Sequence, residues 1–131
     1  MKIGFTGTQE GMSVNQKSEL ENYLNTREAQ RSDEFHHGDC IGADLEAAII
    51  ATDAAYEVHS HPPTDPKKRA FHKSNVVHPK EPYLIRNRRI VDATKILIAA
   101  PKSDKEELRS GTWATIRYAR KLGRKVILLK R

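Results

Sequence analysis

The chain has 131 residues and a formal net charge of +6 at pH 7. Its length suits a single domain, residues 1–131, around one core. No apolar run can span a bilayer, and the first residues lack a signal-peptide pattern, so we expect no membrane partner. Cys40 is the only cysteine, which excludes an internal disulfide and favours the reducing cytoplasm. The positive charge favours anionic partners, either nucleic acid or small phosphorylated ligands.

Five apolar strands alternate with four helical segments along the chain. The predicted strands are residues 2–6, 34–37, 56–60, 96–100 and 126–129. The first predicted helix begins after Ser13 and ends near Arg31. The other three cover residues 45–51, 83–94 and 112–122. Ser13 and Gln16 have the spacing of a capping box, and Gly123 has the place of a C′ residue. The strands are apolar throughout, which is typical of a parallel sheet covered on both faces.

This order of elements predicts an α/β fold. We expect a Rossmann-like three-layer α/β/α sandwich with a mostly parallel five-stranded sheet in the order 3-2-1-4-5. Ligands of such sheets bind beyond the carboxyl ends of the strands. Three loops reach that edge, namely residues 7–8, 38–44 and 110–113. The long loop at residues 61–82 contains five of the six prolines. Its length is typical of a functional lid.

The strand at residues 96–100 leads through a polar loop into a helix that starts at Ser110-Gly111-Thr112. The free N–H groups of a helix start, its dipole and two hydroxyls favour an anion, most often a phosphate. The alternative is an ordinary helix cap, which Ser110 provides unaided. We predict that these three residues bind a ligand phosphate, because the strand–loop–helix context places them at the binding edge.

Two more loops and one helix form the other predicted walls of the site. Gly7 provides a tight turn after the first strand, and Thr8 provides a hydroxyl. Arg86 can bind phosphate with its planar guanidinium, and Asn87 lies beside it. The remaining wall consists of Gly38, Asp39, Gly42 and Asp44. Its glycines allow close approach of a ligand, and an aspartate suits a ribose hydroxyl. Structural turns, helix-dipole contacts and a solvated basic face are the alternatives.

The histidine spacing does not predict a metal site. His36, His37 and Cys40 lie close in sequence, but neighbouring strand residues point to opposite faces. His59 and His61 share one face, yet no second pair follows at a spacing typical of zinc sites. We therefore expect no metal and no cofactor. The sequence also shows no Ser/His/Asp arrangement and no activated cysteine, so no catalytic residue is assigned.

Four segments, in this order, resemble one group of proteins. They are HHGDCIGAD after the second strand, HPPTDPKK after the third, RNRRIVDA in the third helix and SGTWATIRYARKLGRKV near the end. They are similar to the YspA-like branch of the SLOG superfamily, Rossmann-like domains related to the LOG and DprA proteins. The resemblance covers nearly the whole chain. It implies a nucleotide or nucleotide-derived ligand, cleavage of base–ribose phosphates in some branches, and pairing of two copies as a homodimer.

The chain departs from the LOG pattern at one functional position. LOG enzymes carry Gly-Gly before the glycine–threonine turn and a catalytic glutamate three residues after the threonine. Here Arg109-Ser110 precede the turn, and Thr115 stands at the glutamate position. The resemblance therefore implies ligand binding more than hydrolysis, and it leaves open whether the chain is an enzyme.

These observations predict a cytoplasmic nucleotide-binding module, a ligand sensor over which residues 61–82 close. Two alternatives stay open. One is a nucleotide hydrolase or phosphoribohydrolase-like enzyme, in which Asp39, Asp44 or Glu107 supplies the general acid or base. The other is DprA-like binding of single-stranded nucleic acid by the basic C-terminal face.

Overall fold

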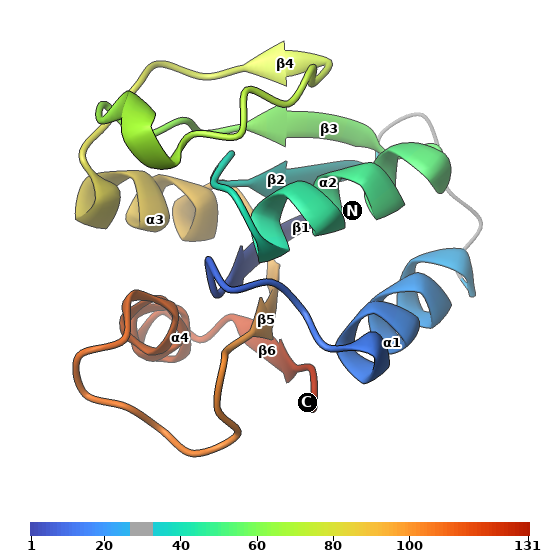
Figure 1. Cartoon of the computed structure of the whole chain (residues 1–131), viewed down its shortest axis with the longest axis vertical. Helices are drawn as coiled ribbons and strands as arrows, with labels where there is room; N and C mark the ends of the chain where they lie inside the picture. The colour runs from blue at the N-terminus through green and yellow to red at the C-terminus, as the bar shows by residue number, and fades with distance from the viewer. Residues whose placement is uncertain (27–32) are drawn as a thin grey trace.

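The computed structural model describes residues 1–26 and 33–131. Its described strands form one parallel sheet in the order β4-β3-β2-β1-β5-β6 (Figure 1). The strands are β1 (Lys2–Gly7), β2 (Glu34–His37), β3 (Glu57–Ser60), β4 (Val76–Val77), β5 (Ile96–Ala100) and β6 (Lys125–Leu128). The α-helices are α1 (Val14–Asn25), α2 (Ala43–Asp53), α3 (Tyr83–Asp92) and α4 (Gly111–Lys121). None of these helices has the length and apolar character needed to cross a membrane.

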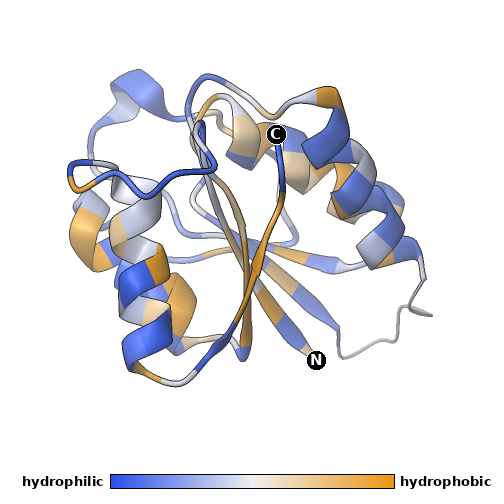
Figure 2. Cartoon of the chain, turned by 90° about the horizontal axis from the view of Figure 1, so that it is seen from below, coloured by the Kyte–Doolittle hydropathy of each residue, from blue (hydrophilic) through white to orange (hydrophobic). Residues whose placement is uncertain are grey.

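Helices cover both faces of the sheet, α1 and α2 on one and α3 and α4 on the other (Figure 1). Hydrophobic residues concentrate along the central strands and the inward helix faces (Figure 2). Ile3 and Phe5 of β1 belong to the core beneath α1 and α2. Gly4, between them, faces α3, and a Cβ there would lie 2.8 Å from Thr94 Oγ1. The missing side chain therefore lets α3 pack close to the centre of the sheet.

The predicted Rossmann-like class and the order of the five predicted strands are confirmed. The strand number is corrected from five to six, because β4 adds an edge strand beside β3. This strand has only two residues and lies within the proline-rich residues 61–82, so no apolar run marks it in the sequence. The same segment holds a short 3₁₀ helix, Pro66–Lys68, whose start is capped when the N–H of Lys67 donates to Asp65 Oδ1.

The predicted helix boundaries rest on caps that the structure contains. Ser13 Oγ accepts from the N–H of Gln16 at 3.1 Å, and Gln16 Oε1 accepts from the N–H of Ser13 at 3.0 Å. The described part of α1 ends at Asn25, and its predicted end near Arg31 lies outside the described residues. Gly123 has a φ of 75° after α4, as a C′ glycine does.

Candidate functional site

A cleft of about 420 Å³ lies at the carboxyl ends of the central strands, bordered by the first turns of α3 and α4. All but two of the predicted site residues line it. They are Gly7, Thr8, Gly38, Asp44, Arg86, Asn87, Ser110, Gly111 and Thr112. Segments that are far apart in the sequence therefore meet here because parallel strands end at one edge.

The start of α4 combines a cap with free donors. Ser110 Oγ accepts from the N–H of Trp113 at 3.2 Å, so the ordinary cap is present. The N–H groups of Gly111 and Thr112 donate to no other described residue, and both residues line the cleft. The cap therefore leaves two donors and the positive end of the helix dipole available to an anion.

Arg86 is 4 % exposed and binds the ends of two strands to α3. Its Nη1 donates to the carbonyl oxygens of Gly38 and His61, and its Nε donates to Asn87 Oδ1 at 2.7 Å. A Cβ on Gly38 would lie 2.6 Å from Arg86 Nη1, so a side chain there would displace this guanidinium. The arginine is therefore held rigidly at the cleft wall, and part of its hydrogen-bonding capacity is used within the protein.

Asp44 is a buried carboxyl at the same wall, and its Oδ2 accepts from the N–H of Cys40 at 3.3 Å. Burial raises the pKa of Asp44 to about 6, although the Arg86 charge and the backbone donor of Cys40 favour the carboxylate. A carboxyl with this pKa exchanges its proton near neutral pH, which is a property of general acids and bases.

Three cleft residues bear charges that the sequence reasoning did not assign to binding. Lys102 and Arg109 are exposed, and neither forms an ion pair with another described residue. Glu107 Oε1 is buried and has no hydrogen-bond partner in the described structure. Their positions carried a usable signal, since Lys102 lies just beyond the end of β5 and Arg109 directly precedes the Ser110 cap.

Two predicted site residues, Asp39 and Gly42, do not line the cleft. Gly42 precedes α2 with a φ of 87°, and an added Cβ would overlap the Gln9 carbonyl. Asp39 is fully buried, and its carboxylate accepts from Arg69 Nε at 2.8 Å and from the N–H of His72 at 2.9 Å. Both residues therefore have structural roles around the cleft.

The lid expectation for residues 61–82 is also corrected. None of the cleft-lining residues comes from this segment. It runs beside β3 instead, and the Asp39 carbonyl accepts from the N–H of Ala70 at 2.8 Å. The length and the proline content of a segment do not distinguish a lid from a segment that extends the sheet. In both cases the sequence shows neither a helical nor a strand pattern.

Replacing Asp39 with alanine should destabilise the protein by about 3 kcal/mol, because it leaves the Arg69 charge and a backbone N–H without their partner. Urea unfolding measures this loss. Asp65→Ala is the matched control, since Asp65 is exposed and accepts one hydrogen bond, from Lys67, so it should cost about 1 kcal/mol or less. Equal losses for the two variants would contradict the anchoring role of Asp39.

Solved structures share this fold, whereas no family model and no curated protein matches the sequence. DNA processing protein A from Streptococcus pneumoniae has a TM-score of 0.71 at 20 % identity, over 97 % of this chain and 49 % of that one. The molybdenum cofactor binding protein from Rippkaea orientalis has a TM-score of 0.74 at 18 % identity, and the match covers 97 % of this chain and 74 % of that protein. DNA processing protein A from Helicobacter pylori has a TM-score of 0.72 at 16 % identity, and the match covers 100 % of this chain and 66 % of that protein.

The chain spans about half of the pneumococcal protein, and the identities to all three structures are low. Such likenesses show the fold alone. They confirm the Rossmann-like fold that the sequence predicted, and membership of the SLOG superfamily and of its YspA-like branch stays a prediction. The fold and the cleft together define an α/β protein with a candidate ligand site at the carboxyl edge of a parallel sheet.

Proposed function

We propose that this chain binds a nucleotide or nucleotide-derived ligand in the cleft and acts in the cytoplasm as a sensor or ligand-binding module. One observation carries the proposal. The start of α4, where the N–H groups of Gly111 and Thr112 donate to no described residue, shares the cleft with the cations of Lys102 and Arg109, which form no ion pair with the described residues. Backbone donors at a helix start and flexible cations are the groups that bind phosphate in proteins.

The other walls of the cleft suit the remainder of such a ligand. Its volume of about 420 Å³ lies within the range of pockets that hold small organic ligands, about 300–1,000 Å³. Asp44 and Glu107 offer acceptors for ribose hydroxyls or base amino groups. Neighbours with this fold are described as binding molybdenum cofactor and single-stranded DNA, which supports a binding role for the same architecture.

A thermal-shift series with AMP, ATP, cyclic dinucleotides, ADP-ribose and adenosine tests the proposal. At a concentration of about 100 Kd, a bound ligand adds about 2.7 kcal/mol to the free energy of unfolding, which raises Tm by several degrees. We expect at least one phosphorylated compound to raise Tm, and we expect adenosine, which lacks phosphate, to have little effect. An equally large Tm shift with adenosine, or no shift with any of the compounds, would contradict phosphate binding at the start of α4.

A second candidate function is hydrolysis of the bound nucleotide, and the raised pKa of Asp44 favours it. Thr115, at the LOG glutamate position, is buried, and its hydroxyl donates to the Gly111 carbonyl at 2.9 Å. It therefore provides no carboxylate to the cleft, and Asp44 or Glu107 would have to act instead. Mass spectrometry after incubation separates the two functions, since a sensor leaves its ligand intact. An enzyme consumes the ligand, and replacement of the acting carboxylate, in Asp44→Asn or Glu107→Gln, should then abolish this consumption.

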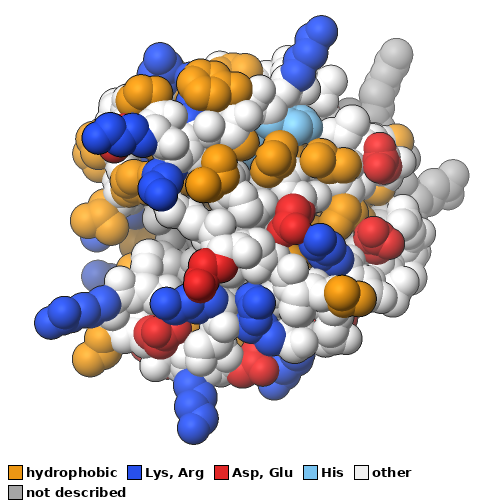
Figure 3. Space-filling view, viewed as in Figure 1, with side chains coloured by type: hydrophobic (Ala, Val, Ile, Leu, Met, Phe, Trp, Pro, Cys, Tyr) orange, Lys and Arg blue, Asp and Glu red, His pale blue; other side chains and the backbone are white. Residues whose placement is uncertain are grey.

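DprA-like binding of single-stranded nucleic acid ranks behind these functions on the charges. Arg117 of α4 forms an ion pair with Glu106 at 2.8 Å, and Arg124 donates to the Val91 carbonyl. On the face shown in Figure 3, basic side chains lie among acidic ones. We expect weak binding of an oligothymidine, measured by fluorescence anisotropy. Tight binding with a steep salt dependence would favour the nucleic-acid function instead.

A further inference from the structure

A group of imidazoles lies on the sheet face that α3 partly covers, apart from the cleft walls. It comprises His36, His59, His61 and His78 and is called here the histidine cluster. His36 of β2 is the register partner of His59 of β3, and their ring centroids lie 4.3 Å apart. His78 follows β4, and its ring stacks on that of His61 with centroids 4.1 Å apart. Three parallel strands therefore assemble a cluster that no sequence spacing suggests.

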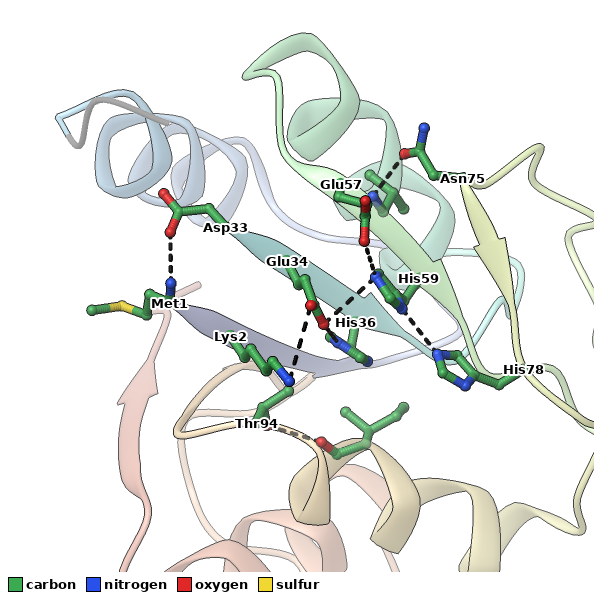
Figure 4. Close-up of polar contacts among 12 residues, drawn as sticks. Met1, Lys2, Asp33, Glu34, His36, Glu57, His59, Asn75, His78 and Thr94 are labelled. Atoms are coloured by element: carbon green, nitrogen blue, oxygen red, sulfur yellow. Dashed lines mark hydrogen bonds and ion pairs between the residues drawn. The ribbon is translucent and has the colours of Figure 1, made fainter. Parts of the chain in front are cut away.

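Two glutamates hold two of these rings in a defined orientation (Figure 4). His36 Nε2 lies 2.8 Å from Glu34 Oε1, and His59 Nε2 lies 2.7 Å from Glu57 Oε1. An ionised carboxylate only accepts hydrogen bonds, so both Nε2 atoms carry the hydrogen. In a neutral imidazole the Nδ1 atom then bears the lone pair. Carboxylates orient metal-binding histidines in the same way.

The two Nδ1 atoms point toward other imidazole nitrogens. His59 Nδ1 lies 2.9 Å from His78 Nε2, and His36 Nδ1 lies 2.7 Å from His61 Nε2. One ligand atom each from His36, His59 and His78 fall within 4.8 Å of one another. Two nitrogens on one tetrahedral Zn²⁺ lie about 3.3 Å apart, given Zn–N bonds of about 2.0 Å. Small side-chain movements would therefore bring the three nitrogens to the spacing of a three-histidine site.

The accessibility of the cluster agrees with metal binding. A second cavity, of about 480 Å³, is lined by His61 and His78 on one side and by residues of α3 on the other. It offers an ion a route to the cluster and leaves room for a water as a fourth ligand.

We propose that His36, His59 and His78 bind a divalent transition-metal ion of the zinc class, with Glu34 and Glu57 orienting the rings. Neutral imidazoles with carboxylate partners suit Zn²⁺, and three histidines with an open fourth position form a known type of zinc site. This inference reverses the expectation of no metal that the sequence spacing supported. None of the three histidines lines the nucleotide cleft, although Arg86 borders both cavities.

The test uses the full chain without a polyhistidine tag, treated with a chelator and then dialysed. Titration with Zn²⁺ in a calorimeter should show one ion bound per chain, and Co²⁺ should produce the intense visible bands of a four-coordinate site. His78→Asn should weaken Zn²⁺ binding by about tenfold or more, since even the loss of an orienting partner costs about 10–100-fold. The absence of stoichiometric binding by the unaltered protein would overturn the proposal.

His72→Asn is the matched control, because His72 lies against His37 and Ser74 rather than in the histidine cluster. It should bind Zn²⁺ as tightly as the unaltered chain, and a loss equal to that of His78→Asn would overturn the assignment. Circular dichroism checks the fold of each metal-free variant. If His78→Asn does not fold, Glu57→Gln replaces it, since Glu57 is 45 % exposed. That variant should weaken binding by about tenfold, and unchanged affinity would refute the site.

Discussion

Replacing Gly111 with leucine abolishes nucleotide binding and leaves the fold intact, if the start of α4 holds the ligand phosphate. Gly111 lines the cleft beside the free donors, and a Cβ built on it meets no atom within 4 Å. The new side chain therefore enters open space at the site and creates no clash in the protein. Leucine also favours a helix more than glycine does, so Tm should not fall.

A graded series separates blocking of the cleft from other effects. Gly111→Ala adds one methyl group and should weaken binding far less than Gly111→Leu. Ala114→Leu adds similar bulk one turn later on α4, at a residue that does not line the cleft, and should bind normally. Calorimetry with the best nucleotide from the thermal-shift series measures all three. Normal nucleotide affinity in Gly111→Leu would refute phosphate binding at the start of α4. That result would not bear on the proposed metal site.

Acidification should unfold the metal-free protein more steeply than its carboxylates alone would do. Burial lowers the pKa of His36 to about 4 and that of His37 to about 3. Their stabilisation is complete above the unfolded pKa of about 6.5 and is lost as pH falls toward the folded pKa. Between pH 7 and pH 4, protonation of each histidine therefore lowers the free energy of unfolding by about 3 kcal/mol. The whole free energy of unfolding of a typical domain is about 5–15 kcal/mol.

Asp44 acts in the opposite direction. Burial raises its pKa to about 6 in the folded state, so its neutral form is favoured there, and acidification from pH 7 to pH 4 restores about 2 kcal/mol. The two histidines outweigh this one carboxyl, and the lowered pKa of His61 and that of His78 add to the loss. The net free energy of unfolding therefore decreases as the pH is lowered.

Urea unfolding in the presence of a chelator, at pH 7, 5.5 and 4, measures this dependence. His37→Gln keeps an acceptor for the N–H of Asp39, which now donates to His37 Nδ1 at 2.9 Å, but it cannot be protonated. Its stability should fall less steeply with pH than that of the unaltered chain. The same slope in both proteins would show that His37 does not carry the acid sensitivity.

Much of the fold was predictable because its signals are local. The apolar runs, the capping box of Ser13 and Gln16 and the C′ glycine at residue 123 each act within a few residues, and all are present in the structure. The right-handed crossovers of parallel sheets then leave few strand orders, and the predicted order was confirmed. The same rule placed the strand ends, and hence most of the predicted cleft residues, at one edge.

The other features depend on pairs that are distant in the sequence. Asp39 looked like a ligand residue, but Arg69 and His72 come to it from a segment that the pattern described only as a loop. The two-residue β4 becomes a strand only because β3 offers it an unpaired edge.

By itself, then, the sequence determined the layered α/β fold and the carboxyl edge where a ligand would bind, because period, caps and handedness are properties of short segments. Only the tertiary structure decided how the side chains at that edge are used. It engages Arg86 with the carbonyls of Gly38 and His61, and it brings His36 and His59 into register. Such partners are set by strand pairing and packing across the sheet, which no short segment encodes.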